Sequence, residues 1–205
     1  MRIRHPLCTL ILALLLVALP AAAEAPGTDT PVGCVELLHG ALTKVMKEAD
    51  ALGFDGREAY LDPVVSTAYD TEFMARKSVG RHWSKLSEVE QQELVSRFGG
   101  LTVATYAGRF NGWSGEAFET LGQEGGVHDT VLVKTKLVRP EDEDVNLDYR
   151  LRKTDSGWRI IDVYANGTIS ELALRRSEYS ALLRREGFPS LIEALDKKIG
   201  EFRES

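Results

Sequence analysis

The sequence VNLDYRLRKTDSGWRIIDV, residues 145–163, decides the fold of this chain. Asp155, Ser156 and Gly157 provide turn chemistry near its middle, and residues 158–163 are rich in apolar side chains again. In its first half apolar and polar residues alternate, which is typical of a strand with one buried face. The segment therefore predicts an antiparallel hairpin whose apolar face needs a cover. The alternating apolar positions are Val145, Leu147, Tyr149 and Leu151.

Two further strands are expected directly before this hairpin. Residues 128–139 form the stronger one and residues 116–124 the weaker one, and the acidic segment 141–144 lies in the following turn. The sequence thus predicts an antiparallel sheet of about four strands. In the stronger strand the residues expected on one face are Val131, Val133, Thr135 and Leu137.

Helical periodicity dominates the rest of the chain. Capping boxes are expected at Ser87 with Glu90 and at Thr168 with Glu171. The long helix after Ser87 has apolar residues on more than one face, so we expect it to be covered on two sides. Helices, a block of strands and helices again predict an α+β fold with the helices on one face of a curved sheet. Apolar spacing predicts helices at 35–52, 55–68, 71–83, 87–110, 169–187 and 188–202.

The first 23 residues resemble a secretory signal peptide. They combine basic Arg2 and Arg4 with the apolar run 7–19 and small residues up to Ala23, after which we expect cleavage. The apolar run is shorter than the roughly 20 residues that span a bilayer. We therefore expect an exported, periplasmic protein. Residues 24–31 are expected to form a flexible tether and residues 32–205 a single domain.

Charge and cysteine content exclude some classes of function and structure. The formal net charge is −6, and removal of a signal peptide that holds two arginines and no acid makes it more negative. Such a chain lacks the basic excess that binds nucleic acid. After cleavage Cys34 is the remaining cysteine, so no internal disulfide is expected, and we interpret it as a small apolar residue of the first helix.

The sequence contains no pattern that predicts catalysis. His39, His82 and His128 have no metal-binding spacing, and we expect surface or capping positions for them, with no metal and no cofactor. The segment 112–116 starts like a nucleophile elbow, but Glu116 takes the place of its last glycine. An exported α+β domain of this kind usually binds a ligand, and its interior is either a packed core or an apolar pocket.

Two segments resemble the MlaC, or toluene-tolerance, family. Residues 69–83, YDTEFMARKSVGRHW, are similar to the family pattern F-D-x-x-x-M-A-R-x-x-x-G-R-x-W. The hairpin 145–163 is similar to the family block V-D-Y-R-L-x-K-x-x-x-G-W-x-V-x-D-V. The segment 167–179, GTISELALRRSEY, resembles the hopanoid-associated branch of the family, HpnM, rather than the phospholipid carriers.

The resemblance implies a periplasmic lipid carrier with an NTF2-like fold and an apolar cavity between sheet and helices. The cargo would be a hopanoid or a phospholipid. The implied partners are an inner-membrane transporter complex of the ABC/MCE or RND type and an outer-membrane acceptor. The carrier would shuttle lipid between these complexes and make or break no bonds.

The sheet and the helices together supply the residues that we expect to line the cavity. Plain core packing remains the alternative for each of them. A second hypothesis is an NTF2-like hydrolase or isomerase that uses Tyr149, Asp162 and His128, and a third is a structural adaptor without cargo. The expected lining residues are Phe73, Met74, Phe98, Leu101, Val131, Val133, Leu147, Tyr149, Leu151 and Ile169.

Overall fold

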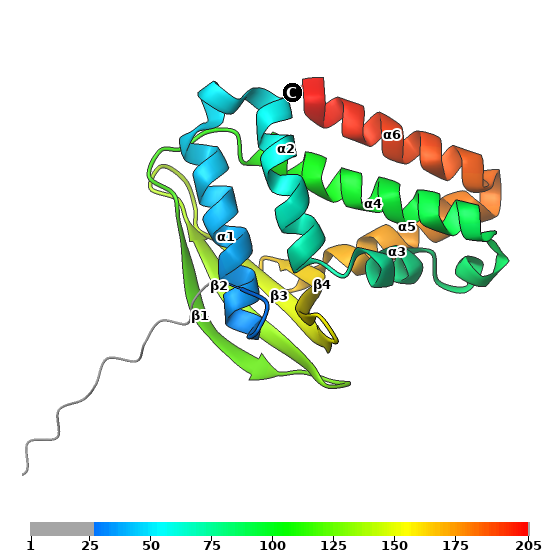
Figure 1. Ribbon diagram of the computed structural model, residues 1–205, viewed down its shortest axis with the longest axis horizontal. Coiled ribbons are helices and arrows are strands. Elements are labelled where there is room, and N and C mark those ends of the chain that lie inside the picture. The colour runs from blue at the N-terminus through cyan, green and yellow to red at the C-terminus, as the bar shows by residue number, and fades with distance from the viewer. Residues whose placement is uncertain (1–26, 205) are drawn as a thin grey trace, which may run out of the picture.

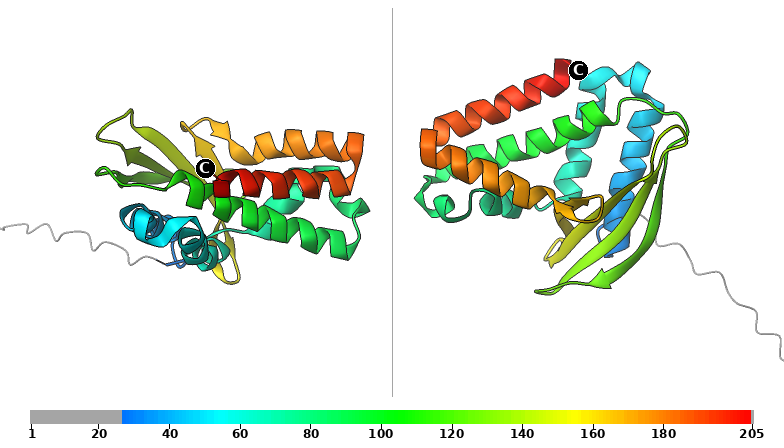
Figure 2. Two further views of the ribbon diagram at one scale, coloured as in Figure 1. Left: turned by 90° about the horizontal axis from the view of Figure 1, so that it is seen from above. Right: turned by 180° about the vertical axis from the view of Figure 1, so that it is seen from behind.

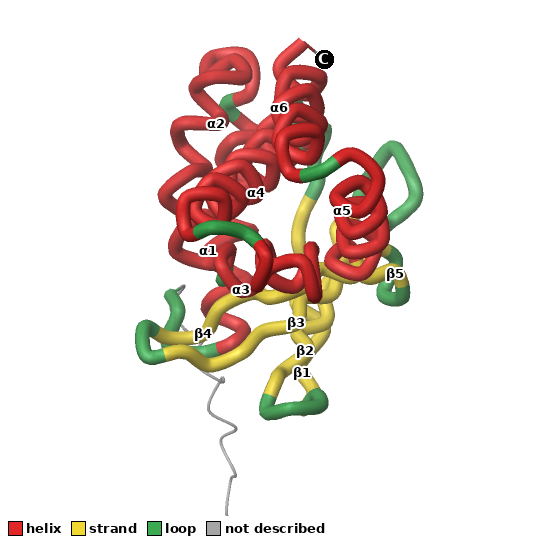
Figure 3. The backbone as a smooth tube through the Cα atoms, turned by 90° about the vertical axis from the view of Figure 1, so that its right-hand side faces the viewer, coloured by secondary structure: helices red, strands yellow, loops and turns green. Residues whose placement is uncertain are grey.

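The computed structural model describes residues 27–204, which form helices on one side of a single antiparallel sheet (Figures 1 and 3). The strands are β1 (Ala117–Gly125), β2 (Thr130–Val138), β3 (Val145–Thr154), β4 (Gly157–Ala165) and β5 (Ile169–Ser170). The helices are α1 (Pro31–Lys47), α2 (Ala49–Ala68), α3 (Thr71–Val79), the 3-10 helix η1 (Gly80–Lys85), α4 (Glu88–Arg109), α5 (Glu171–Glu186) and α6 (Phe188–Glu204). The α+β prediction is confirmed.

The predicted hairpin forms the centre of the sheet. Strands β3 and β4 pair antiparallel, and Gly157 adopts a φ of 105° directly after the turn. This backbone conformation favours glycine, which explains the residue at that position. The strand order is β1-β2-β3-β4-β5. The two-residue β5, which pairs with the end of β4, was absent from the sequence prediction because so short a strand has no periodicity to detect.

Helix α4 packs against other helices and has little contact with the sheet. Buried Arg57 of α2 donates a 2.8 Å hydrogen bond from Nε to the carbonyl oxygen of Ala107 in α4. Gly108 allows α6 to approach, because a Cβ atom there would lie 2.9 Å from Cδ1 of Phe202. Figures 1 and 2 show α6 running alongside α4. The prediction that this helix is covered on two sides is confirmed.

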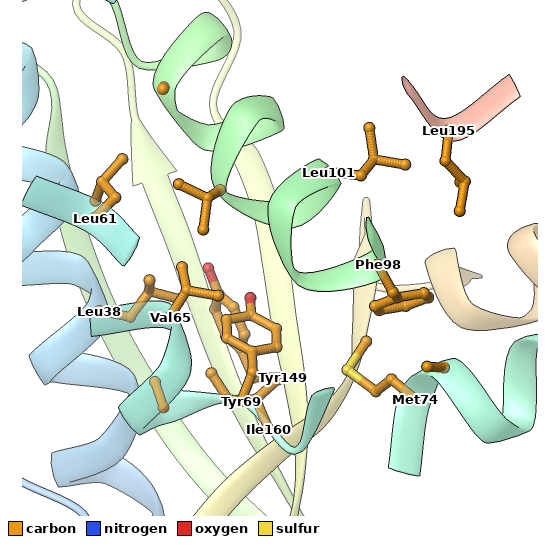
Figure 4. Close-up of a cluster of buried hydrophobic side chains, with 14 of the residues drawn as sticks. Leu38, Leu61, Val65, Tyr69, Met74, Phe98, Leu101, Tyr149, Ile160 and Leu195 are labelled. Carbon is orange, nitrogen blue, oxygen red and sulfur yellow. The ribbon is translucent and has the colours of Figure 1, made fainter. Parts of the chain in front are cut away.

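The core lies between the hairpin and the helices α1, α2 and α4. Leu38 of α1, Val65 of α2 and Phe98 of α4 are buried with Tyr149 and Ile160 of the sheet (Figure 4). Burial of such side chains contributes roughly 1.5–3 kcal/mol each relative to exposure. Cys34 is fully buried in α1, as predicted, and burial raises the pKa of its thiol to about 11.

Two predicted helix boundaries were wrong. The first helix ends at Lys47 rather than before Gly53, and Gly53, with a φ of 59°, instead interrupts α2. The predicted capping box at Thr168 is replaced by Ser170, whose side chain accepts a hydrogen bond from the backbone N–H of Ala173. The short β5 explains this shift, because it carries the chain two residues further before α5 begins.

The N-terminal segments are only partly described. The expected signal peptide, residues 1–23, and residues 24–26 of the expected tether lie outside the described residues. From Gly27 onward the structure differs from a free tether. The carbonyl oxygen of Thr28 accepts a 2.7 Å hydrogen bond from the backbone N–H of Trp158, and Gly27 donates to Gly33. This segment is therefore hydrogen-bonded to the hairpin before α1 begins.

Asp162 joins the sheet to the start of α5. Its carboxylate is buried and accepts hydrogen bonds from the backbone N–H groups of Val163 and Leu172, at 2.9 and 3.1 Å. Ser170 donates a third hydrogen bond from its hydroxyl, at 2.6 Å. A charged group with three donors stabilises this corner far more than an exposed carboxylate does.

We predict that Asp162→Ala lowers the free energy of unfolding by about 3 kcal/mol, because three donors lose their acceptor. Urea unfolding followed by circular dichroism measures the change. Asp155→Ala, in the exposed β3–β4 turn, is the matched control and should change stability by less than about 0.5 kcal/mol. Equal stabilities of the two variants would contradict the capping role of Asp162.

Candidate functional site

A cavity of about 610 Å³ lies between α4 and the sheet. Strands β3 and β4 form its floor, α4 forms its roof, and α5 and the loop 110–116 border its opening. The cavity exists because α4 is held by α2 and α6 and does not close onto the strands. Its apolar and aromatic lining includes Tyr106, Phe110, Leu147, Tyr149 and Val163.

The tyrosine hydroxyls in the wall are paired inside the protein. Tyr69 and Tyr106 share a short hydrogen bond between their hydroxyls. Burial raises the pKa of Tyr106 to about 12 and the pKa values of Tyr69 and Tyr149 well above their usual range. All three side chains are therefore neutral at ordinary pH. A wall of aromatic rings with neutral, paired hydroxyls suits an apolar ligand.

Tyr149 is held from behind by a histidine of α1. The Nε2 atom of His39 lies 3.1 Å from the Tyr149 hydroxyl, and the His39 ring stacks on Phe118 with 4.0 Å between ring centroids. The expectation that His39 is a surface or capping residue was wrong, since His39 is only 5% exposed. Burial lowers the pKa of its imidazole to about 3. His39 is thus a neutral support that orients Tyr149.

Charged side chains gather at the border of the cavity. Arg109 of α4 and Arg175 of α5 both line it, together with Glu171 and Arg139. The guanidinium carbon of Arg175 lies 4.8 Å from the ring centroid of Phe98, which is a cation–π contact. Within residues 27–204, no carboxylate lies within ion-pair distance of Arg109 or Arg175. The border is therefore polar and charged, while the interior is apolar.

The ten residues expected to line the cavity do not all reach it. Met74, Leu147 and Tyr149 border the cavity. Phe98, Leu101, Val133 and Leu151 do not border this cavity and are buried in the core around it. The remaining three, Phe73, Val131 and Ile169, lie elsewhere.

These three residues are displaced for different reasons. Phe73 is half-buried in α3, and the guanidinium carbon of Arg152 lies 4.5 Å from its ring centroid. Val131 is half-buried in β2 beyond the edge of the cavity. Ile169 is 47% exposed in β5. Its neighbour Ser170 caps α5, which turns the apolar side chain outward.

Several lining residues were missed by sequence reasoning. Tyr106 and Phe110 lie one helical turn apart at the end of α4, and their ring centroids are 5.8 Å apart. Their spacing and the Trp113 of the next loop were a detectable signal of an aromatic cluster. The position of Arg175 could not be predicted, because it depends on how α5 crosses the end of the sheet.

The residues of the enzyme hypothesis are not gathered at one place. The carboxylate of Asp162 accepts a hydrogen bond from the backbone at the start of α5. His128 lies in the exposed turn between β1 and β2 and has a φ of 55°. Tyr149 alone of the three lines the cavity. Within residues 27–204 no cluster of three or more histidine, cysteine or acidic side chains is arranged to hold a metal ion. None of the helices described is both long and apolar enough to cross a membrane.

Comparisons with known proteins bear on the family and the fold of the chain. A family model described as MlaC protein matches residues 38–197. A solved structure of a phospholipid-binding protein from Ralstonia solanacearum, in complex with a phospholipid, superposes with a TM-score of 0.73. The two chains are 20% identical, and the match covers 85% of this chain and 98% of the other, a likeness that shows the fold. No curated protein sequence matches the chain.

We predict that His39 makes the protein less stable as the pH falls. The unfolded chain binds a proton at His39 near pH 6.5, whereas the folded chain does so only near pH 3. Stability is therefore fully present above about pH 6.5 and is lost towards pH 3, by an amount on the order of a few kcal/mol. The urea midpoint of the wild type should fall more steeply between pH 6.5 and 4 than that of His39→Gln.

The control for this measurement is His82→Gln, which removes a less buried histidine from η1. Its urea midpoint should follow the pH dependence of the wild type. A slope for His39→Gln that equals the wild-type slope would show that the imidazole is not buried in its neutral form.

Proposed function

This chain belongs to the MlaC family, and on that basis we propose that it is a carrier that encloses the hydrocarbon part of a lipid. The observation that carries the proposal is the cavity of about 610 Å³ between α4 and the sheet. This volume lies within the range of roughly 300–1,000 Å³ that is usual for ligand pockets. Its aromatic and aliphatic wall supplies the surface that a lipid chain needs.

A carrier is required because lipids leave a membrane slowly by themselves. Moving hydrocarbon into water costs about 0.8 kcal/mol for each CH₂ group, so a whole chain costs on the order of 10 kcal/mol. Enclosure in the cavity offsets most of this cost, while the charged border around Arg109 and Arg175 keeps the head of the lipid in contact with water. The protein then contributes shape and burial and no covalent chemistry.

The state of the buried titratable groups favours binding over catalysis. The pKa of Tyr149 is raised and that of His39 is lowered, both by burial, so neither exchanges a proton near pH 7. An acid–base enzyme needs groups whose pKa values lie near the working pH. A structural adaptor without cargo is disfavoured by the volume that side chains leave unfilled.

We propose a periplasmic location and transfer between two membranes. The expected signal peptide, residues 1–23, supports export, and an inner-membrane transporter complex and an outer-membrane acceptor would be the donor and the receiver. The cargo is either a phospholipid, as in the solved structure of the Ralstonia protein, or a hopanoid, as the segment 167–179 suggests.

Extraction of the native protein tests this function. The protein is purified from the periplasm without detergent, extracted with organic solvent, and its lipids are identified by mass spectrometry. We expect about one lipid for each protein, and the spectrum separates a phospholipid from a hopanoid. Absence of stoichiometric lipid would contradict the carrier function.

Filling the cavity should abolish cargo binding. We predict that Ala165→Trp, on the floor of the cavity, loses most of the bound lipid, because an indole ring takes the space of the chain. The matched control is Ala117→Trp, at an exposed position of β1, which should retain the wild-type amount. Lipid is quantified in both variants after circular dichroism has shown that they are folded. Equal lipid content would show that the cargo binds elsewhere.

A further inference from the structure

We propose that the groove between α4, α5 and α6 is a second compartment of the lipid site, which holds the second hydrocarbon chain of a two-chain lipid. The inference rests on the proposed function and adds the location of each hydrocarbon chain. This second compartment has a volume of about 370 Å³. Its cargo class is a lipid with two separate chains, whereas a fused-ring lipid needs one continuous space.

The floor of the second compartment is apolar. Leu101 of α4 and Leu191 and Leu195 of α6 line it, and all three are buried (Figure 4 shows Leu101 facing Leu195). Leu182 and the buried ring of Tyr179 form the α5 side. These side chains offer the same kind of surface as the main cavity. Hydrocarbon placed here would therefore be removed from water.

The two compartments are neighbours that share one partition. Four residues line both of them, namely Thr105 and Arg109 of α4 and Glu171 and Arg175 of α5. Within each pair the residues are four positions apart, so they lie on the same helix face. The partition thus consists of side chains from two helices.

The partition suits the head of a lipid, from which two chains diverge. The Thr105 hydroxyl donates a 2.6 Å hydrogen bond to the carbonyl oxygen of Leu101, so it is already satisfied. Arg175 packs on Phe98 and donates a 3.5 Å hydrogen bond to the Thr102 hydroxyl. Guanidinium groups bind the anionic oxygens of a head group well. A head group at Arg109 and Arg175 places one chain in each compartment.

One side of α5 lies open at the second compartment. Tyr179 is the buried residue of this helix, and Leu174, which borders the second compartment, is 48% exposed. A second chain would cover this exposed leucine and add apolar contact that α5 otherwise lacks. Because this compartment shares its partition with the main cavity, its occupant is part of the same ligand.

The test fills the second compartment alone. Ala194 of α6 lines it and is exposed, so Ala194→Trp is compatible with folding and places an indole in the groove. The matched control is Ala51→Trp, at an exposed position of α2. Each purified protein is incubated with vesicles that contain equal amounts of dioleoylphosphatidylglycerol and its single-chain lyso form, and native mass spectrometry then gives the ratio of the two bound lipids.

The wild type and Ala51→Trp should bind mainly the two-chain lipid. Ala194→Trp should shift the ratio towards the single-chain lipid by about tenfold, the effect of losing the burial of about two CH₂ groups. Leu182→Trp fills the same compartment from α5 and should give the same shift. This variant is used in place of Ala194→Trp if Ala194→Trp does not fold.

The outcomes distinguish failure of the second-compartment proposal from failure of the proposed function. An unchanged ratio in both filling variants would overturn the second compartment and leave the carrier function intact. Equal binding of the single-chain and the two-chain lipid by the wild type would also overturn it. Failure of the wild type to take up any lipid would overturn the proposed function itself.

Discussion

The structure depends on the position of α4, which is held by helices on its flanks and has little contact with the sheet. Arg57 binds the carbonyl oxygen of Ala107 from α2, and Gly108 lets Phe202 of α6 pack closely. Helix α1 packs on the sheet instead, where Leu38 and His39 meet the hairpin. The apolar face of the strands is therefore covered in one part and open in another. That open part is the main cavity, which exists because the helices pack more tightly on one another than on the strands.

The wall of the cavity shows how polar atoms are tolerated beside an apolar ligand. The hydroxyls of Tyr69 and Tyr106 satisfy each other, and Tyr149 is satisfied by His39. Burying such groups without a partner would cost several kcal/mol, and their pairing removes the need for water in the cavity. The charges are kept at the border, where Arg109 and Arg175 face both compartments. The division into an apolar interior and a charged border matches the division of an amphiphile into chain and head.

The sequence predicted the elements better than the site. The alternation from Val145 to Leu151 and the turn before Gly157 are local signals, and the hairpin was found where they indicated. The cap at Ser87 is equally local and was confirmed. Of the expected lining, Met74, Leu147 and Tyr149 reach the cavity, because periodicity identifies a buried face without showing which part of that face remains uncovered. Tyr69, Tyr106 and Arg175 were missed, since their meeting depends on the crossing of helices that are distant in the sequence.

The central claim is that the space between α4 and the sheet is where hydrocarbon binds. The most direct measurement is a crystal structure of the protein loaded with a lipid whose chain carries bromine, because the anomalous signal of bromine locates the chain independently of the protein atoms. The account predicts a bromine peak inside the main cavity, near Leu147, Tyr149 and Val163. A peak only on the outer surface, with the cavity filled by protein side chains, would contradict it.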